Sequence, residues 1–307
     1  MLTKDSSVET ASVILTNKLA KSYGRVRALR SVDLDVRQGE IFGFLGPNGA
    51  GKTTTIRCLL DLIRPSGGNA LVLGLDPQKA SREVRSRSGY LPGELHVEGN
   101  ASVAGTLRYL NGLRGNKADW KFVQLLAEKL DLDLKTQVKN LSKGNKQKVG
   151  LVQALMHQPE LLLLDEPTFG LDPLVQHEVL KLIVEARTAG ATIFFSSHIL
   201  SEVQEIADRV GIIRKGLVVE VAETASLLKR ALRRVRVRFH EPIDGERLGE
   251  IPGVAFLKQD DQQTVLLQVE GEMDGLIKSL AAHTVVDFET EQPSLEEIFL
   301  AYYKGDA

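Results

Sequence analysis

The stretch GPNGAGKTT, from Gly46 to Thr54, decides the fold predicted for this chain. It satisfies the spacing G-x-x-x-x-G-K-S/T, follows the apolar run IFGFLG and opens TTTIRCLLDLI, which has helical length. In such a unit the glycines let backbone N–H groups wrap phosphate oxygens, and the helix N-terminus adds partial positive charge. We therefore expect a phosphate-binding loop rather than a flexible glycine turn. Its predicted nucleotide-binding residues are Gly46, Pro47, Asn48, Gly49, Ala50, Gly51, Lys52, Thr53 and Thr54.

The chemistry expected around this loop needs a cation and carboxylates. Lys52 is predicted to reach the β- and γ-phosphates, and the Thr53 hydroxyl to bind Mg²⁺. The run LLLLDEP ends a buried strand in two carboxylates, of which Asp165 would hold Mg²⁺ through water and Glu166 would polarise an attacking water. A helix-capping turn is the alternative for this pair. His198 ends the next apolar run, ATIFFSSH, where a lone histidine is commonly structural.

The order of elements predicts the fold class. Residues 13–17 and 31–40 alternate apolar and polar side chains as half-buried strands do, and residues 95–139 have a helical pattern. LLLLDEP and ATIFFSSH are continuous apolar runs, each followed by a helical segment. Strands that alternate with helices predict an α/β fold with a parallel sheet covered on both faces. The composition shifts near residue 222, and residues 223–307 predict a second, smaller α+β domain.

Composition narrows the classes of partner. The 307 residues carry 39 lysines and arginines against 40 acidic residues, so no global charge attracts nucleic acid or an anionic membrane. The single cysteine, Cys58, cannot form an intrachain disulfide, which favours a reducing cytosolic setting. We expect Cys58 to be a small packing residue. No apolar run approaches the roughly 18 residues that span a bilayer, and no signal peptide begins the chain. We expect no direct membrane insertion.

Five motifs stand in a fixed order: GPNGAGKTT, LSKGN, LLLLDEP, GLDP and SSH. In this order and spacing, residues 13 to about 222 resemble the nucleotide-binding subunit of ATP-binding-cassette (ABC) transporters. The resemblance implies a P-loop NTPase of ABC type, in which the parallel core sheet is joined by an antiparallel β subdomain and a helical subdomain, here about 95–158. It also implies ATP and Mg²⁺ as cofactors, ATP hydrolysis, and a homodimer with composite sites.

The stretch LSKGN corresponds to the LSGGQ signature of that family. The resemblance therefore implies that Ser142, Lys143, Gly144 and Asn145 contact the γ-phosphate of an ATP held by a second copy, together with the N-terminus of a helix expected to begin near Asn145. Two other interpretations stay open, a nucleic-acid contact made by Lys143, Lys146 and Lys148 and a simple solvated turn.

Other roles follow from the resemblance, position by position. Tyr23 would stack on adenine, although an isolated tyrosine is often a packing residue. Asp172, in GLDP, would sit at the dimer interface, and His198 would contact the γ-phosphate and hold the attacking water with Glu166.

The sequence departs from the family pattern at three places. Gly93 stands where the family has a glutamine that reaches Mg²⁺, and Glu94 either takes over the metal contact or is an ordinary loop glutamate. Lys143 and Asn145 replace a glycine and a glutamine of the signature. Phe169 replaces a serine near the expected dimer interface, where its ring either slows closure or simply packs.

The C-terminal region, about 223–304, ends in PSLEEIF and resembles the C-terminal domain of exporter ATPases similar to the daunorubicin exporter. Its basic stretch, Lys229 to His240, alternates arginine with valine, which is typical of a half-buried strand with a solvated face. The alternatives are a lipid or nucleic-acid contact, and its expected role is subunit contact or regulation.

The resulting hypothesis is the ATP-hydrolysing subunit of an exporter for drugs or antibiotics. It would dock under a separate integral-membrane permease on the cytoplasmic face of the cell membrane, with no nucleic-acid partner. The rival is an ABC ATPase that moves no solute and acts on a membrane complex, on DNA or on ribosomes.

Overall fold

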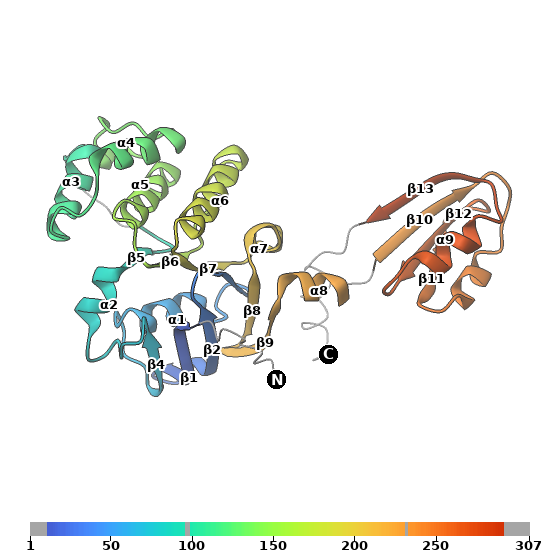
Figure 1. Cartoon of the computed structure of the whole chain (residues 1–307), viewed down its shortest axis with the longest axis horizontal. Helices are drawn as coiled ribbons and strands as arrows, with labels where there is room; N and C mark the ends of the chain where they lie inside the picture. The colour runs from blue at the N-terminus through green and yellow to red at the C-terminus, as the bar shows by residue number, and fades with distance from the viewer. Residues whose placement is uncertain (1–10, 96–98, 231–232, 292–307) are drawn as a thin grey trace, which may run out of the picture. The chain divides into compact units, whose positions relative to one another are not determined.

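The computed structural model describes residues 11–95, 99–230 and 233–291, and it divides the chain into two compact units, Met1–Val221 and Ala222–Ala307 (Figure 1). Within the described residues, no helix is both long and apolar enough to cross a bilayer.

A nine-stranded sheet forms the centre of the first unit, with the strand order β4-β1-β2-β9-β8-β3-β7-β6-β5. The strands β8, β3, β7, β6 and β5 pair in parallel, whereas β1 pairs antiparallel with β2 and β4. This mixed sheet confirms the predicted α/β class with a parallel core and an antiparallel part. The bounds are β1 Ser12–Tyr23, β2 Val26–Arg37, β3 Ile41–Leu45, β4 Gly67–Val72, β5 Ser88–Leu91, β6 Leu161–Asp165, β7 Thr192–Ser197, β8 Arg209–Arg214 and β9 Leu217–Glu223.

The central strands are buried on both sides. Every residue of β3, β6 and β7 is buried, as expected for apolar runs in a parallel sheet. On one face, Phe42 and Phe44 pack in a cluster that includes Ile56 and Cys58 of helix α1, Lys52–Leu59. On the other face, helix α7, Leu200–Ile206, comes so close that a Cβ on Gly43 would lie 2.6 Å from Val203. Helices therefore cover both faces of the sheet, as predicted.

The remaining helices of this unit are α2 Ser81–Arg87, α3 Val103–Leu113, α4 Trp120–Lys129, α5 Lys143–Leu155 and α6 Pro173–Thr188, with a 3₁₀ turn at Val138–Asn140. Both α3 and α4 pack against α5. In Figure 1 these three helices lie together at one end of the unit, away from β1 and β4. The helical pattern expected over residues 95–139 is thus interrupted by turns.

Two boundaries differ from the sequence prediction. Helix α1 ends at Leu59 rather than continuing to residue 63, because Asp61 takes a left-handed conformation with φ of 50°. Helix α5 begins at Lys143, two residues before the start expected near Asn145, because Ser142 already accepts a capping hydrogen bond from the backbone N–H of Asn145.

The second unit contains a four-stranded antiparallel sheet in the order β11-β12-β10-β13 and is α+β, as predicted. On β10 the valines and Phe239 are buried while the arginines are exposed, so this strand is half-buried as the alternation predicted. The closing PSLEEIF segment lies outside the described residues. The bounds are α8 Thr224–Arg230, β10 Arg233–Phe239, a 3₁₀ turn at Gly245–Glu250, β11 Val254–Gln259, β12 Thr264–Val269, α9 Asp274–Leu280 and β13 Val285–Glu291.

Candidate functional site

The sheet order brings three loops to one edge. Leu45 of β3 lies opposite Ser197 of β7, and Asp165 of β6 lies opposite Ser196. Because these strands are parallel, their carboxyl ends meet at the same edge of the sheet. The phosphate-binding loop, Glu166 and His198 each follow directly after one of these ends and therefore converge.

The loop between β3 and α1 needs its glycines for space and for backbone conformation. A Cβ on Gly46 would lie 2.5 Å from the carbonyl oxygen of Ile213. Gly51 has a φ of 118°, and a Cβ there would lie 2.9 Å from the carbonyl oxygen of Ala28. Gly51 is also the N-cap of α1 and provides no side chain, so no side chain caps the first N–H groups of this helix. These N–H groups can therefore donate to an anion.

A pocket opens over this loop, on the side of α1. Its lining joins the loop to the run LLLLDEP, since it consists of Ala28, Pro47, Asn48, Gly49, Gly51, Lys52, Thr53, Thr54 and Glu166. Thr53, whose hydroxyl is predicted to bind Mg²⁺, therefore lines the same pocket as Lys52.

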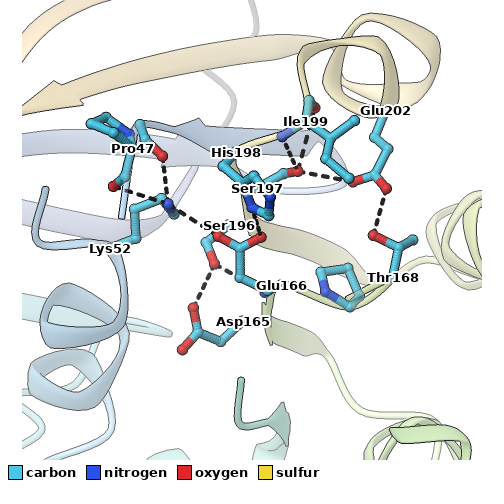
Figure 2. A network of polar contacts seen from close by, with 12 residues as sticks. Pro47, Lys52, Asp165, Glu166, Thr168, Ser196, Ser197, His198, Ile199 and Glu202 are labelled. Carbon is cyan, nitrogen blue, oxygen red and sulfur yellow. Dashed lines mark hydrogen bonds and ion pairs between the residues drawn. The ribbon is translucent and has the colours of Figure 1, made fainter. Parts of the chain in front are cut away.

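Lys52 is 5% exposed, and its Nζ lies 3.0 Å from Glu166 Oε1 (Figure 2). The same ammonium donates to the carbonyl oxygens of Gly46, at 2.5 Å, and Pro47, at 3.3 Å. The second carboxylate oxygen of Glu166, Oε2, lies 2.6 Å from His198 Nδ1. Glu166 thus bridges the phosphate-loop lysine and the histidine after β7.

Asp165 is fully buried at the end of β6 and uses one of its two oxygens. Ser196 Oγ donates to Oδ1 at 2.6 Å, and the backbone N–H of Glu166 donates to the same hydroxyl at 3.1 Å. Among the described residues Oδ2 has no hydrogen-bond partner. A buried carboxylate oxygen with unused lone pairs suits a hard cation or its water, so Asp165 fits a Mg²⁺ site.

Gly93 lies beside that unpartnered oxygen. A Cβ built on it would be 3.2 Å from Asp165 Oδ2, so a longer side chain at this position would extend toward that oxygen. The adjacent Glu94 is exposed in the loop after β5 and does not line the pocket. The structure therefore places Gly93, rather than Glu94, next to Asp165.

The signature residues lie outside this pocket. Ser142 caps α5, accepting from the N–H of Asn145 at 3.2 Å, and Asp172 caps α6, accepting from the N–H of Val175 at 3.1 Å. Both capping side chains are exposed. A Cβ on Gly144 would lie 3.0 Å from the carbonyl oxygen of Gly170, so the start of α5 packs closely on the loop that leads to Asp172.

Lys143 and Phe169, two of the three departures from the family pattern, contact each other. The Lys143 ammonium lies 4.5 Å from the centre of the Phe169 ring, and that ring meets His198 edge-on with 6.4 Å between ring centres. Tyr23 is 47% exposed and carries the ammonium of Lys21 over its ring at 5.1 Å. It does not line the pocket.

Four residues that the sequence analysis did not single out hold the site together: Gln147, Thr168, Ser196 and Glu202. Gln147 Nε2, on α5, donates to the carbonyl oxygen of Glu166 at 3.1 Å. The signal for Ser196 is a pair of serines at the end of an otherwise apolar buried strand, but Gln147 and Glu202 have no local pattern that separates them from other polar helix residues.

Together, the fold and the site define a P-loop ATPase. Residues 29–169 match the family described as ABC transporter, and residues 224–303 match the C-terminal domain of ATP-binding proteins like DrrA1-3.

Two curated relatives cover much of the chain. The bacitracin transport ATP-binding protein BcrA of Bacillus licheniformis is 39% identical over 72% of this chain and 72% of its own length. YhaQ of Bacillus subtilis, an uncharacterized ABC transporter ATP-binding protein, is 32% identical over 94% of this chain and 97% of its own.

Solved structures agree in fold. An ATP-binding subunit of an ABC transporter superposes with a TM-score of 0.65 at 28% identity, covering 70% of this chain and 92% of that one. A dimeric ATP-binding cassette bound to ADP and phosphate superposes with a TM-score of 0.60 at 19% identity, covering 69% and 98%.

The chain therefore belongs to the ABC transporter ATP-binding proteins. It is an ATP-binding and ATP-hydrolysing subunit with a DrrA-like C-terminal domain, as predicted.

Proposed function

We propose that this subunit powers an exporter of antibiotics or other drugs, as a homodimer docked under a separate permease on the cytoplasmic face of the membrane. The bacitracin transport relative and the DrrA-like domain support the substrate class. Residues 1–222 form the ATPase domain, with a helical subdomain at about 95–158, and residues 223–307 form an accessory domain. One observation carries the hydrolytic part, the bridge from Lys52 through Glu166 to His198.

The Lys52–Glu166 contact supports a way of coupling nucleotide entry to hydrolysis. A γ-phosphate that enters the pocket competes with Glu166 for the buried ammonium, because both are anions within reach of Nζ. Once Lys52 turns to the phosphate, Glu166 Oε1 is free to accept a proton from the attacking water. His198 keeps hold of Oε2, so the carboxylate stays oriented while its other oxygen acts as the base.

Thr53 and Asp165 would hold Mg²⁺, which would neutralise charge on the β- and γ-phosphates when it is bound. The unpartnered Oδ2 of Asp165 supports this assignment. Glu94 is the weaker candidate ligand, because its side chain is exposed and does not line the pocket, whereas the neighbouring Gly93 adjoins Asp165 Oδ2. Tyr23 would offer its ring to adenine after displacing Lys21.

The dimer is supported by the separation between the two parts of the site. The N-terminus of helix α5 and the Lys143 ammonium do not line the pocket of their own chain, as Ser142, Lys143, Gly144 and Asn145 are absent from its lining. A second copy is needed to bring such a group to the γ-phosphate. Asp172, which caps the neighbouring helix α6, would lie at the same interface. Loss of the γ-phosphate would remove these contacts and release the dimer.

The test is affinity purification of the tagged Glu166→Gln variant from detergent-solubilised membranes of the host, followed by mass spectrometry. ATP should be present, so that the variant stays in the nucleotide-bound state. We expect a polytopic membrane protein to copurify. Recovery of ribosomes, DNA or soluble proteins alone would overturn the exporter assignment in favour of an ABC ATPase that moves no solute.

A further inference from the structure

Glu202 is a buried carboxylate that the mechanism above does not use. It lies in the first turn of α7 and is 6% exposed. Each of its oxygens accepts a hydrogen bond from a hydroxyl group: Oε1 from Thr168 at 2.5 Å and Oε2 from Ser197 at 2.8 Å (Figure 2). Both acceptors of the side chain are therefore committed to neighbouring loops.

The two hydroxyl groups flank the catalytic pair. Thr168 stands two residues after Glu166, in the loop that leads to Asp172, and Ser197 immediately precedes His198. The Ser197 hydroxyl also accepts from the backbone N–H of Ile199 at 2.9 Å. A continuous chain of hydrogen bonds thus runs from the loop after β6, through Glu202, to both sides of His198.

The position of Glu202 is costly for a charged group, and burial raises the pKa of its carboxyl. A buried carboxylate is stabilised only when its oxygens receive hydrogen bonds. The hydrogen bonds from Thr168 and Ser197 oppose the effect of burial, because they lower the pKa of the Glu202 carboxyl. In return, the carboxylate fixes both hydroxyl rotors as donors, which holds the two loops at a set separation. An apolar side chain here would pack without making that connection.

We propose that Glu202 is a positioning residue for ATP hydrolysis. It connects Thr168, in the loop after β6, to Ser197, at the end of β7, so that Glu166 and His198 stay in contact. This inference rests on the proposed function of Glu166 and His198. The same link passes any displacement of the loop ending at Asp172, which faces the second copy, to the histidine at the γ-phosphate.

The conservative variants separate positioning from folding. Glu202→Gln keeps the size of the side chain but removes its charge and replaces one acceptor with an amide donor. One of the two hydroxyl groups then loses its carboxylate acceptor and can only accept from the amide. Thr168→Val keeps the shape and removes the hydroxyl, whereas Thr168→Ser keeps the hydroxyl. Glu205→Gln is the matched control, because Glu205 lies on the same helix but is 49% exposed and pairs with His177 instead.

The experiment measures steady-state ATP hydrolysis and ATP affinity of the full chain. We expect Glu202→Gln and Thr168→Val each to lower kcat by about 10- to 100-fold, as for a displaced catalytic group, with ATP affinity unchanged within about twofold. The double variant should be no slower than the slower single variant, because both remove the same link. Thr168→Ser and Glu205→Gln should retain wild-type kcat. The proposal is wrong if both single variants keep wild-type kcat, or if their losses multiply.

A second readout does not depend on turnover. The imidazole ¹⁵N resonance of His198, assigned with His198→Gln, should shift in Glu202→Gln and Thr168→Val but not in Glu205→Gln. Glu166→Gln is assayed in parallel. If Glu166→Gln hydrolyses ATP normally, the proposed role of Glu166 fails, and the resonance still decides whether Glu202 holds His198. An unmoved resonance in Glu202→Gln overturns the positioning role by itself.

Discussion

The two halves of the proposed ATP site differ in the contacts that their charged groups make within the chain. In the half made by the phosphate loop, Glu166 and His198, the lysine is buried and every charged group has a partner within the chain. In the signature half, the caps of helices α5 and α6, Ser142 and Asp172, are exposed, and the Lys143 ammonium lies over an aromatic ring. The first half is preassembled around its own carboxylate, whereas the second offers donors outward. In the proposed mechanism, one chain therefore supplies the base, Glu166, but only part of the groups that bind the phosphates.

The largest expected effect on kcat comes from a substitution in the preassembled half, at Glu166. Glu166→Gln removes the base and the negative partner of Lys52, so kcat should fall by about 10²-fold or more. ATP binding should survive, because the phosphate loop is unchanged. Phosphate release and nucleotide binding by the purified protein measure the two properties. Turnover at the wild-type rate would exclude Glu166 from the mechanism.

The next largest effect comes from a substitution in the signature half, at Ser142, and concerns dimerisation. In the Glu166→Gln background, Ser142→Ala should raise the ATP concentration needed for dimerisation by about 10- to 100-fold, since each site loses a charge-assisted hydrogen bond. Sedimentation velocity at increasing ATP measures this. Ser102→Ala is the matched control, because Ser102 caps α3 through the same bond, from the N–H of Gly105. An equal effect of both substitutions would assign the loss to helix stability alone.

A third prediction concerns the contact between His157, beyond the C-terminal end of α5, and Arg114. His157, which follows α5, is partly buried and accepts a hydrogen bond from Arg114, and burial together with that charge lowers its pKa to about 4. Because the folded pKa lies below the unfolded value of about 6.5, protonation favours the unfolded state. The stabilisation is present above pH 6.5 and is lost as the pH falls toward 4.

The expected loss of unfolding free energy for His157 is about 1–3 kcal/mol between pH 7.5 and 4.5. Urea unfolding at several pH values measures it, and His157→Gln should remove this part of the pH dependence. If the variant shows the same acid loss as the wild type, other groups are responsible.

The smallest expected effect concerns the free energy of unfolding and the contact between Lys143 and Phe169. The Lys143–Phe169 contact should contribute about 0.5–1 kcal/mol, as exposed cation–π pairs do. A double-mutant cycle of Lys143→Gln and Phe169→Leu, read by urea unfolding, measures the coupling. Phe169→Tyr keeps an aromatic face and should preserve it. Additive single losses would show that the ring merely packs.

Much of the fold followed from local patterns. The apolar runs before Gly46 and Glu166, and the alternation on β10, are properties of neighbouring residues, and the structure contains strands at each. The patterns were weaker guides to helix ends, as α1 shows, because a single left-handed residue ends a helix without altering its apolar periodicity. Short elements such as α2 and α8 carry too few apolar residues to produce a helical period.

The sequence by itself determined the phosphate loop, the α/β class and the identity of the catalytic candidates, because spacing within one strand–loop–helix unit is a local property. Only the tertiary structure decided that Lys52, Glu166 and His198 meet, that Gly93 adjoins Asp165 Oδ2, and that Lys143 rests on Phe169. It also revealed Glu202 between Thr168 and Ser197. The physical reason is strand order. β3 lies between β7 and β8, and β6 beside β7, so residues more than a hundred positions apart share one sheet edge that no local periodicity encodes.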